Sequence, residues 1–427
     1  MTQAHPRLPL PPPLDGCQPG TFTHYTITTR WPAIVQNVVR DNAWPAVVVA
    51  QLAALRADLP DGIIRPLAPS AAPDSAAWQT YVQPYLGQRW LEAPWFFGET
   101  YFYRRLLEAT GYFEGGAGAG VDPFARQKQQ GLVNSLAATR TLCAQLAALH
   151  QAEQQDDALL RHLLTVALWG NQADLSLSPT VAGAPNPADP SVHRAGEPTA
   201  AETHILVNDT GAVIAYLADV DPQAVRIDII LDNAGFELVS DLCLADFLVR
   251  RGRAATVVLH GKAHPTFVSD ATVADVHATL LVLANDVDPT VQALASRLQE
   301  YLQQGQLQLQ DDLFWTSPLS LWATPPHLVE ELSQARLLIS KGDANYRRLL
   351  GDRHWPFTTP FAEVVCYTPA PLLALRTLKS EIIVGLRPEQ PATLGALEPA
   401  WLTNGRWGII QCTEATHGTT AKDSAGG

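Results

Sequence analysis

The chain has 427 residues, of which 47% are hydrophobic and 17% charged, so it can bury a sizeable core and is not disordered throughout. Its formal net charge of -13 repels nucleic acid and anionic lipid, so neither is expected as a partner. The same charge repels phosphorylated compounds, so a phosphate site in this chain would need local cations or a metal ion.

The cysteine pattern and the apolar runs indicate a cytoplasmic protein. The number of cysteines is odd and none forms a CxxC pair, which argues against a disulfide framework and a structural zinc site. The first residues lack a basic stretch followed by an apolar run, so no signal peptide is expected. No apolar run approaches the ~20 residues that span a bilayer. The oligomeric state is left open.

The first part of the chain is expected to be helical. Apolar residues recur at helical spacing in several segments, and the last two are rich in Leu, Ala and Gln. These segments are Trp31–Arg56, Trp78–Leu86, Trp95–Ala109, Leu132–Gln154 and Asp157–Trp169. Between them, the glycine-rich stretch Glu114–Val121 does not match GxGxxG and is expected to be a surface loop.

A segment rich in Pro, Ala and Gly marks the best candidate boundary between two domains. This segment runs from Ser178 to Glu202 and is typical of a linker. We therefore expect a mainly helical domain over residues 1–185 and an α/β domain over 186–415. The small, polar residues 416–427 are expected to be disordered.

Beyond this segment, predicted strands alternate with predicted helices. The strands are Val225–Leu231, Ala255–Leu259, Ala335–Ser340 and Glu381–Leu386, and the helices are Phe236–Arg251, Thr272–Ala284 and Asn345–Leu350. This alternation predicts an α/β fold: a mostly parallel sheet flanked by helices in a Rossmann-like three-layer sandwich, with the helical domain before it. Ligands of such sheets bind beyond the carboxyl ends of the strands, where chemistry should be sought.

Two acids and an amide follow the first two predicted strands. Asp232 and Asn233 come directly after one strand, and Asp270 lies in the segment after the next. Carboxylate and amide oxygens are hard donors suited to magnesium, manganese or a similar ion. Each residue could instead cap the helix that follows it. Read alone, the residues leave both interpretations open.

Basic residues lie near the last two predicted strands. The third strand leads through Gly342 into a helix that carries Arg347 and Arg348, an arrangement that suits a phosphate. Arg376 and Lys379 precede the fourth predicted strand and could add positive charge. An ordinary turn with solvated basic residues is the alternative in both places.

The chain resembles the metal-dependent damage-control phosphatase family, also described as domain of unknown function 89. The resemblance covers about Thr21 to Leu386 and rests on segments around Pro94–Arg105, Leu168–Ser176, Leu231–Glu237, Phe267–Asp270, Lys341–Arg347 and Arg376–Lys379. The last segment, Arg-Thr-Leu-Lys, resembles the mark of the third subfamily, the sugar-phosphate branch, which also holds a protein described as an acidic-residue methyltransferase. Gln172 departs from the family pattern, where a Lys is expected.

This resemblance implies a division of roles. It implies that Asp232, Asn233 and Asp270 are catalytic and hold a divalent ion (manganese, cobalt, nickel or magnesium). It also implies a substrate site, formed by Asp343, Ala344, Asn345, Tyr346 and Arg347, with Lys379 binding phosphate and Glu237 at a ligand-binding position. The implied activity is hydrolysis of small phosphorylated metabolites, such as fructose 1-phosphate, in a damage-control role.

Several alternatives stay open. Asp232 could attack phosphorus as a nucleophile or could only bind the metal ion. The chain could be an S-adenosylmethionine-dependent carboxyl methyltransferase, although no glycine-rich loop suited to that cofactor is apparent, or a non-catalytic binding protein. The helical part could be a packing unit or a lid, and in the second case Trp95, Glu99 and Arg104 would face the cleft.

Overall fold

The computed structural model describes residues 5–151, 156–176, 202–218 and 225–413. Its centre is a seven-stranded sheet in the order β1-β7-β6-β5-β2-β3-β4. The strands are β1 Ile205–Asn208, β2 Arg226–Ile230, β3 Thr256–Lys262, β4 Leu307–Asp312, β5 Leu337–Lys341, β6 Leu372–Thr377 and β7 Gly408–Cys412. All neighbours are parallel except β6 and β7. The predicted α/β class with a mostly parallel sheet is confirmed.

The strand order reverses direction between β2 and β5. From β2 the chain continues outward to β3 and β4, and then crosses to the other side of β2 to form β5 and β6. A crevice opens at such a reversal point, just beyond the carboxyl ends of the strands, and it is the usual ligand site in parallel sheets. The segments that follow β2 and β5 therefore border the expected ligand site.

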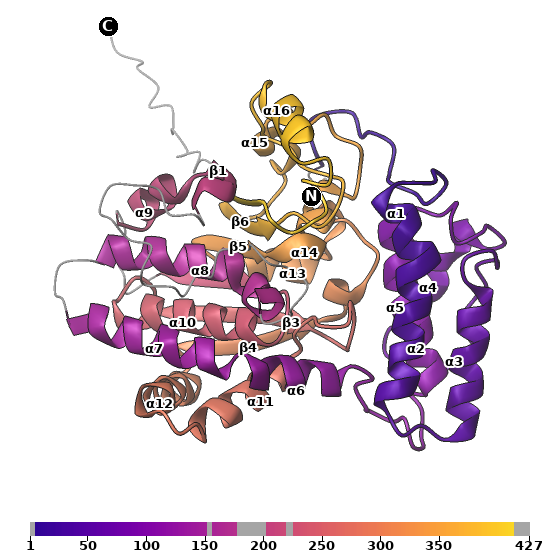
Figure 1. The fold of residues 1–427 in the computed structure, drawn as a ribbon, viewed down its shortest axis with the longest axis horizontal. Helices are drawn as coiled ribbons and strands as arrows, with labels where there is room; N and C mark the ends of the chain where they lie inside the picture. The colour runs from indigo at the N-terminus through magenta and orange to yellow at the C-terminus, as the bar shows by residue number, and fades with distance from the viewer. Residues whose placement is uncertain (1–4, 152–155, 177–201, 219–224, 414–427) are drawn as a thin grey trace, which may run out of the picture.

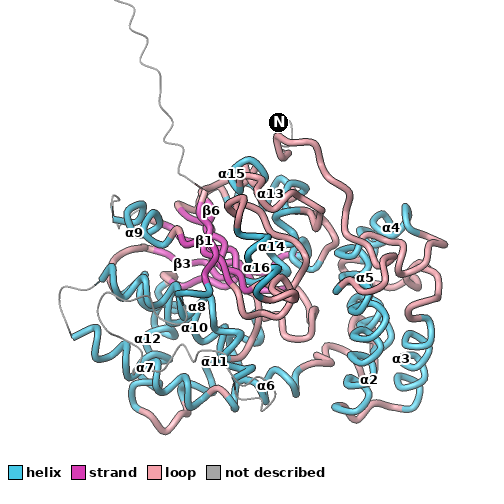
Figure 2. The backbone as a smooth tube through the Cα atoms, turned by 45° about the horizontal axis from the view of Figure 1, so that its top comes forward, coloured by secondary structure: helices cyan, strands magenta, loops and turns pink. Residues whose placement is uncertain are grey.

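Helices cover both faces of the sheet (Figures 1 and 2). One face packs against α7 Leu136–Gln151, α8 Asp156–Ser176, α9 Thr210–Ala218, α10 Phe236–Arg250, α11 Val273–Ala284 and α12 Pro289–Gln304. Helices α13 Pro326–Leu332, α14 Gly342–Leu350, α15 Phe361–Val364 and α16 Gln390–Leu397 lie with the other core cluster. Alternation along β5 explains this division, because Leu337 and Ile339 enter the first cluster and Leu338 the second.

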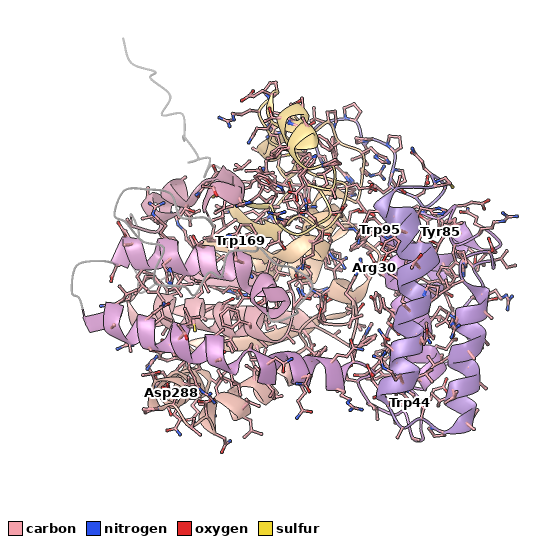
Figure 3. The ribbon with its side chains drawn as sticks, viewed as in Figure 1. Arg30, Trp44, Tyr85, Trp95, Trp169 and Asp288 are labelled. Atoms are coloured by element: carbon pink, nitrogen blue, oxygen red, sulfur yellow. The ribbon has the colours of Figure 1, made fainter. Side chains whose placement is uncertain are left out.

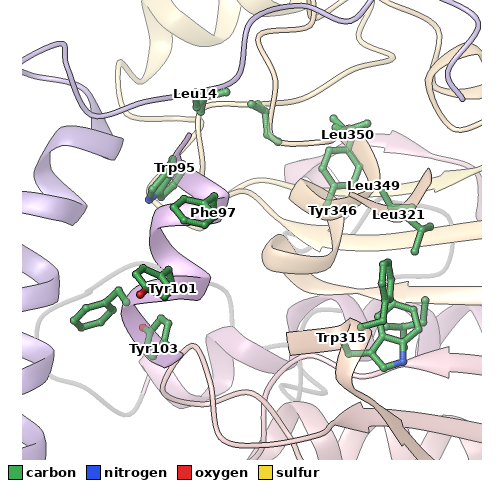
Figure 4. Close-up of a cluster of buried hydrophobic side chains, with 14 of the residues drawn as sticks. Leu14, Trp95, Phe97, Tyr101, Tyr103, Trp315, Leu321, Tyr346, Leu349 and Leu350 are labelled. Carbon is green, nitrogen blue, oxygen red and sulfur yellow. The ribbon is translucent and has the colours of Figure 1, made fainter. Parts of the chain in front are cut away.

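The N-terminal helices form a group beside the sheet (Figure 1). They are α1 Phe22–Tyr25, the π-helical η1 Thr26–Arg30, α2 Trp31–Asp41, α3 Ala46–Asp58, α4 Ser75–Val82 and α5 Trp95–Thr110, and α6 Ala125–Asn134 follows. Trp31 stacks on Phe102 of α5, with ring centroids 5.1 Å apart. Buried side chains of α5 and α14 belong to one hydrophobic cluster (Figure 4). The N-terminal helices therefore pack onto the α/β part through α5.

Short 3-10 helices complete the fold. They are η2 Gln83–Tyr85, η4 Glu202–His204, η6 Leu313–Thr316 and η7 Leu321–Ala323. Within the described residues, every helix is too short or too polar to cross a membrane. The predicted glycine-rich loop Glu114–Val121 is confirmed as a series of turns between α5 and α6.

The fourth predicted strand, Glu381–Leu386, is wrong. The strand in this region is β6, which ends at Thr377, so Arg376 lies at the carboxyl end of a strand and not before one. Ile382, Ile383 and Val384 form an apolar run that resembles a buried strand, but it packs into the core as a loop. Strands β1, β4, β6 and β7 were not predicted.

The predicted domain boundary cannot be placed on the described residues. The boundary at 185/186 and almost all of the linker Ser178–Glu202 lie outside them, as does the tail 416–427. Helices α7 and α8 fall within the predicted helical domain, yet α8 packs on α10 and α7 packs on α12. We infer that these two helices belong with the sheet that they cover.

Candidate functional site

A cavity of about 180 Å³ lies beyond the carboxyl ends of the central strands, next to the N-terminal helices. It is lined by Phe22, Arg30, Trp95, Glu99, Asp232, Asn233, Phe267, Ser269, Asp270, Asp343, Ala344, Arg347 and Lys379. Arg30 and Trp95 come from the N-terminal helices (Figure 3), and the last four follow β5 and β6. The cavity therefore coincides with the reversal point of the sheet.

The three predicted metal ligands meet in this cavity because the backbone joins their segments. Asn233 and Asp270 form an isolated antiparallel bridge between the loops after β2 and β3. The Ala234 N–H donates to the Ser269 carbonyl, and the Ala271 N–H donates to the Asp232 carbonyl, both at 2.7 Å. This pairing brings the side chains of Asp232, Asn233 and Asp270 to one wall.

None of these three residues caps a helix. Helix α10 begins after Gly235, which makes no side-chain cap. Helix α11 is capped by Thr272, whose hydroxyl accepts from the Asp275 N–H while the Asp275 carboxylate accepts from the Thr272 N–H. The capping interpretation of Asp232, Asn233 and Asp270 is therefore wrong.

The two carboxylates are crowded and buried. Burial raises the pKa of Asp232 well above its ordinary value, and the negative charges of Glu237 and Asp270 raise it further. Burial also raises the pKa of Asp270 to about 6, although the Lys262 ammonium, 3.3 Å from its Oδ2, opposes this effect. Asp270 Oδ2 is buried and accepts no hydrogen bond from the described residues. The site thus carries two buried carboxylates whose mutual repulsion the Lys262 ammonium only partly offsets.

A divalent cation fits this donor set. Two carboxylates and an amide oxygen are the hard ligands that magnesium and manganese prefer, and a cation would relieve the repulsion between the acids. Across residues 5–151, 156–176, 202–218 and 225–413, no group of three or more His, Cys, Asp or Glu side chains could hold a metal ion. The candidate therefore depends on the Asn233 amide oxygen as its third donor.

Gly342 closes the site from the side of β5. Its φ is +81°, a left-handed conformation that favours glycine, and a Cβ atom there would lie 1.9 Å from Asp232 Oδ2. Only glycine lets the backbone after β5 approach the Asp232 carboxylate this closely.

Two residues on the other side of the site have strained backbones. Phe267 and Val268 have φ angles of 48° and 67°, which are unusual for residues other than glycine. The Phe267 ring is held by Phe96 and Tyr103 of α5, with ring centroids 6.2 and 5.2 Å away. Strain of this kind persists only where packing imposes it and gathers at functional sites. Here it turns the chain just before Asp270.

The cations at the cavity differ in their availability. The buried Arg347 guanidinium binds both oxygens of Asp352, pairs with Glu99, and lies 3.5 Å from the centre of the Trp95 ring. Lys379 and Arg30 also line the cavity, and within the described ranges neither forms a salt bridge, although the Lys379 charge acts on the nearby Asp232 carboxylate. Lys379 and Arg30 are therefore the cations best able to meet an incoming anion.

The other predicted substrate residues divide into two groups. Asp343 and Ala344 line the cavity, and Asp343 accepts from the Arg376 guanidinium at 2.8 Å and from the Lys379 N–H at 3.2 Å. Asn345 and Tyr346 point away from it: the Asn345 amide donates to the Leu231 and Lys341 carbonyls, and the Tyr346 hydroxyl contacts Gln411. Their side chains support the site from behind.

Glu237 lies beneath the site, outside the cavity lining. Its carboxylate accepts from the Asn233 amide at 2.9 Å and from the Lys341 ammonium at 3.0 Å. Burial raises the pKa of Glu237, but Lys341 and Asn233 outweigh burial, and the pKa ends below its ordinary value. Glu237 is thus an ionised, internally bonded carboxylate.

The N-terminal helices shape one side of the cavity. Trp95 and Glu99 line it, as the lid interpretation expected, whereas Arg104 is buried in an ion pair with Asp74 and does not. Sequence reasoning did not identify Phe22 or Arg30, because only the packing of these helices brings them to the strand ends. The side chains of 171–176, which include Gln172, lie outside the described set.

Comparisons with known proteins agree with the resemblance. A family model described as the damage-control phosphatase ARMT1-like domain matches residues 26–394. The damage-control phosphatase ARMT1 of Mus musculus is 34% identical over 93% of this chain and 97% of its own length, and that of Homo sapiens is 34% identical over 94% and 98%. A solved DUF89 family protein from Pyrococcus horikoshii aligns with a TM-score of 0.46 and 13% identity, over 91% of this chain and 97% of that one. The chain belongs to the damage-control phosphatase ARMT1-like family.

Proposed function

We propose that this protein is a metal-dependent phosphatase that hydrolyses small phosphorylated metabolites, with sugar phosphates such as fructose 1-phosphate as substrates. The phosphatase class follows from the family to which the chain belongs. The metal ion and the sugar phosphate are proposals that rest on the site. We also propose a cytoplasmic location, on the cysteine pattern.

One observation supports the proposal most strongly. Asp232, Asn233 and Asp270 converge on a cavity that is also lined by the cations Lys379 and Arg30. A phosphomonoester needs both features, because its dianion requires positive charge and its transferred group gains from a Lewis acid.

Two groups of residues would bind the metal ion and the phosphoryl group. Asp232, Asn233 and Asp270 would hold manganese, cobalt, nickel or magnesium, and the bound ion would neutralise the carboxylates and polarise a phosphoryl oxygen. Lys379 and Arg30 would bind the remaining phosphoryl oxygens and fix the direction of the leaving oxygen.

The rest of the substrate would lie against the N-terminal helices. Glu99 can accept hydrogen bonds from sugar hydroxyls, and Trp95 and Phe267 supply apolar surface that excludes water. A cavity of about 180 Å³ suits a small metabolite and not a macromolecule. Whether Asp232 also attacks phosphorus is a separate question, which chemical trapping of a phosphoryl-aspartate would answer.

No observation favours the methyltransferase alternative. Glu237, the residue that the resemblance linked to ligand binding, contacts Asn233 and Lys341 and does not line the cavity. The cavity wall is instead rich in charges that suit a phosphate and a cation.

The phosphate role of Lys379 can be tested by replacement. Lys379→Met should raise the KM for fructose 1-phosphate by about 10-fold to 100-fold, since a hydrogen bond to a charged group is worth about 1.5–3 kcal/mol. Arg387→Met is the matched control, because it removes the same charge from an exposed residue outside the cavity. Equal KM values for the two variants would contradict the role of Lys379.

A further inference from the structure

The Asn233 amide is held at both ends. Its Nδ2 donates to Glu237 Oε2 at 2.9 Å and to Asp232 Oδ2 at 2.6 Å. Its Oδ1 accepts from the Ser269 hydroxyl at 2.6 Å. Asn233, Ser269 and Asp232 line the cavity and Glu237 does not, so Glu237 holds the NH2 end of the amide from outside the cavity lining.

This orientation matters because the two ends of an amide are not equivalent toward a cation. Oxygen can bind a metal ion, whereas the NH2 group, with its two hydrogens, cannot. The two ends have similar size, so packing alone does not distinguish them. A carboxylate partner distinguishes the two ends, because it only accepts hydrogen bonds and therefore pairs with the NH2 end.

Glu237 is itself fixed by a buried lysine. The Lys341 ammonium is fully buried at the end of β5 and donates to Glu237 Oε1 at 3.0 Å and to the Ala167 carbonyl at 2.7 Å. It also lies 3.0 Å from Asp241, one turn further along α10. The Lys341 ammonium thus links β5 to α8 and α10 beneath the cavity.

We propose that Glu237 and Lys341 are positioning residues that hold the Asn233 amide with its oxygen toward the metal position, and that neither touches the metal ion or the substrate. This inference rests on the proposed metal site. It gives Glu237 a different role from the ligand-binding one that the family resemblance implied. Partners of this kind typically change metal affinity by about 10-fold to 100-fold when they are removed.

The test measures manganese binding directly, by titration calorimetry on metal-stripped protein without substrate. Glu237→Gln keeps the size of the side chain but lets the Asn233 amide turn over, and it should weaken manganese binding by about 10-fold to 100-fold. Asp241→Asn is the matched control, because it also removes a buried carboxylate from Lys341 but does not contact Asn233. It should change the affinity by less than about 3-fold.

A second background separates positioning from a merely structural role. In Asn233→Asp the ligand has two equivalent oxygens, so its orientation no longer needs to be fixed. Adding Glu237→Gln to this variant should then change the affinity by less than about 3-fold. The difference from the roughly 10-fold to 100-fold effect expected in the natural protein would be a large coupling between the two positions. An equal loss in both backgrounds would overturn the inference.

The remaining outcomes are also decisive. If the natural protein does not bind manganese, the proposed metal site fails and this inference fails with it. If the natural protein binds manganese and Glu237→Gln binds it equally well, only the positioning role is overturned. Thermal unfolding of each metal-free variant checks that it folds. If Glu237→Gln does not fold, Glu237→Asp repeats the cycle, because it keeps the charge beside Lys341 but withdraws it from Asn233.

Discussion

Replacing Gly342 with alanine should separate the stability of the fold from the integrity of the metal site. The new Cβ would lie 1.9 Å from Asp232 Oδ2, and the φ of +81° is unfavourable for alanine. Two costs follow. The left-handed conformation costs about 1–2 kcal/mol, and the carboxylate must move away from the methyl group.

The size of that movement can be worked out from the contact. Carbon and oxygen atoms at this position need a separation of at least 3.0 Å, so the Asp232 oxygen must shift by at least 1.1 Å, which is 3.0 minus 1.9. Metal ligands tolerate displacements of about 0.2 Å. Asp232 would therefore be lost as a ligand, and we expect manganese affinity to fall by more than about 100-fold, beyond the loss typical of supporting residues.

Gly305→Ala provides the matched control. Gly305 has a φ of +75° at the end of α12, and nothing lies within 4 Å of the Cβ position. Urea denaturation should show a loss of about 1–2 kcal/mol for Gly305→Ala and at least that loss for Gly342→Ala. Calorimetry should show unchanged manganese binding only for Gly305→Ala. If Gly342→Ala bound manganese as tightly as the natural protein does, the reasoning would be refuted, because Asp232 would not be a ligand at this position.

Two further predictions concern polar groups in the segment between β3 and α11. Thr272→Ala removes the hydroxyl half of the capping box of α11 and should lower the free energy of unfolding by about 1 kcal/mol in urea denaturation; an unchanged midpoint would contradict the role of the cap. Burial lowers the pKa of His264 to about 4. Its unfolded form takes up a proton near pH 6.5, so the stability that it contributes is full above that pH and is lost as the pH falls. Between pH 7 and 5 the natural protein should lose about 2 kcal/mol more than His264→Gln, and equal losses would show that His264 is not held neutral.

Much of the sheet was predictable because parallel strands buried on both faces are continuous apolar runs. This holds for much of β3 and β5, and Ile227, Ile229 and Ile230 indicate β2 although Asp228 interrupts its apolar run. The same reasoning failed near the carboxyl end of the chain, where two apolar runs compete. Leu372–Leu375 lacks β-branched residues and becomes a strand, whereas Ile382–Val384 has them and does not. The first run pairs with β5 on one side and β7 on the other, and no local pattern indicates these distant pairings.

The residues of the site also differ in whether the local sequence or the packing of distant segments brings them to the cavity. Asp232, Asn233 and Asp270 could be identified because they follow strands whose ends meet at one edge. Arg30 could not, because it reaches the cavity only through the packing of the N-terminal helices. Sequence alone also does not show that Glu99 and Asp352 neutralise Arg347, which leaves its guanidinium less available than that of Arg30.

The central claim is that phosphate release depends on a metal ion held by Asp232, Asn233 and Asp270. The most direct measurement is phosphate release from fructose 1-phosphate by metal-stripped protein to which manganese, cobalt, nickel or magnesium is added back, compared with Asp270→Asn under the same conditions. We predict release only with added metal ion and a loss of at least about 100-fold in Asp270→Asn. Release without any metal ion, or equal rates for the variant and the natural protein, would contradict the claim.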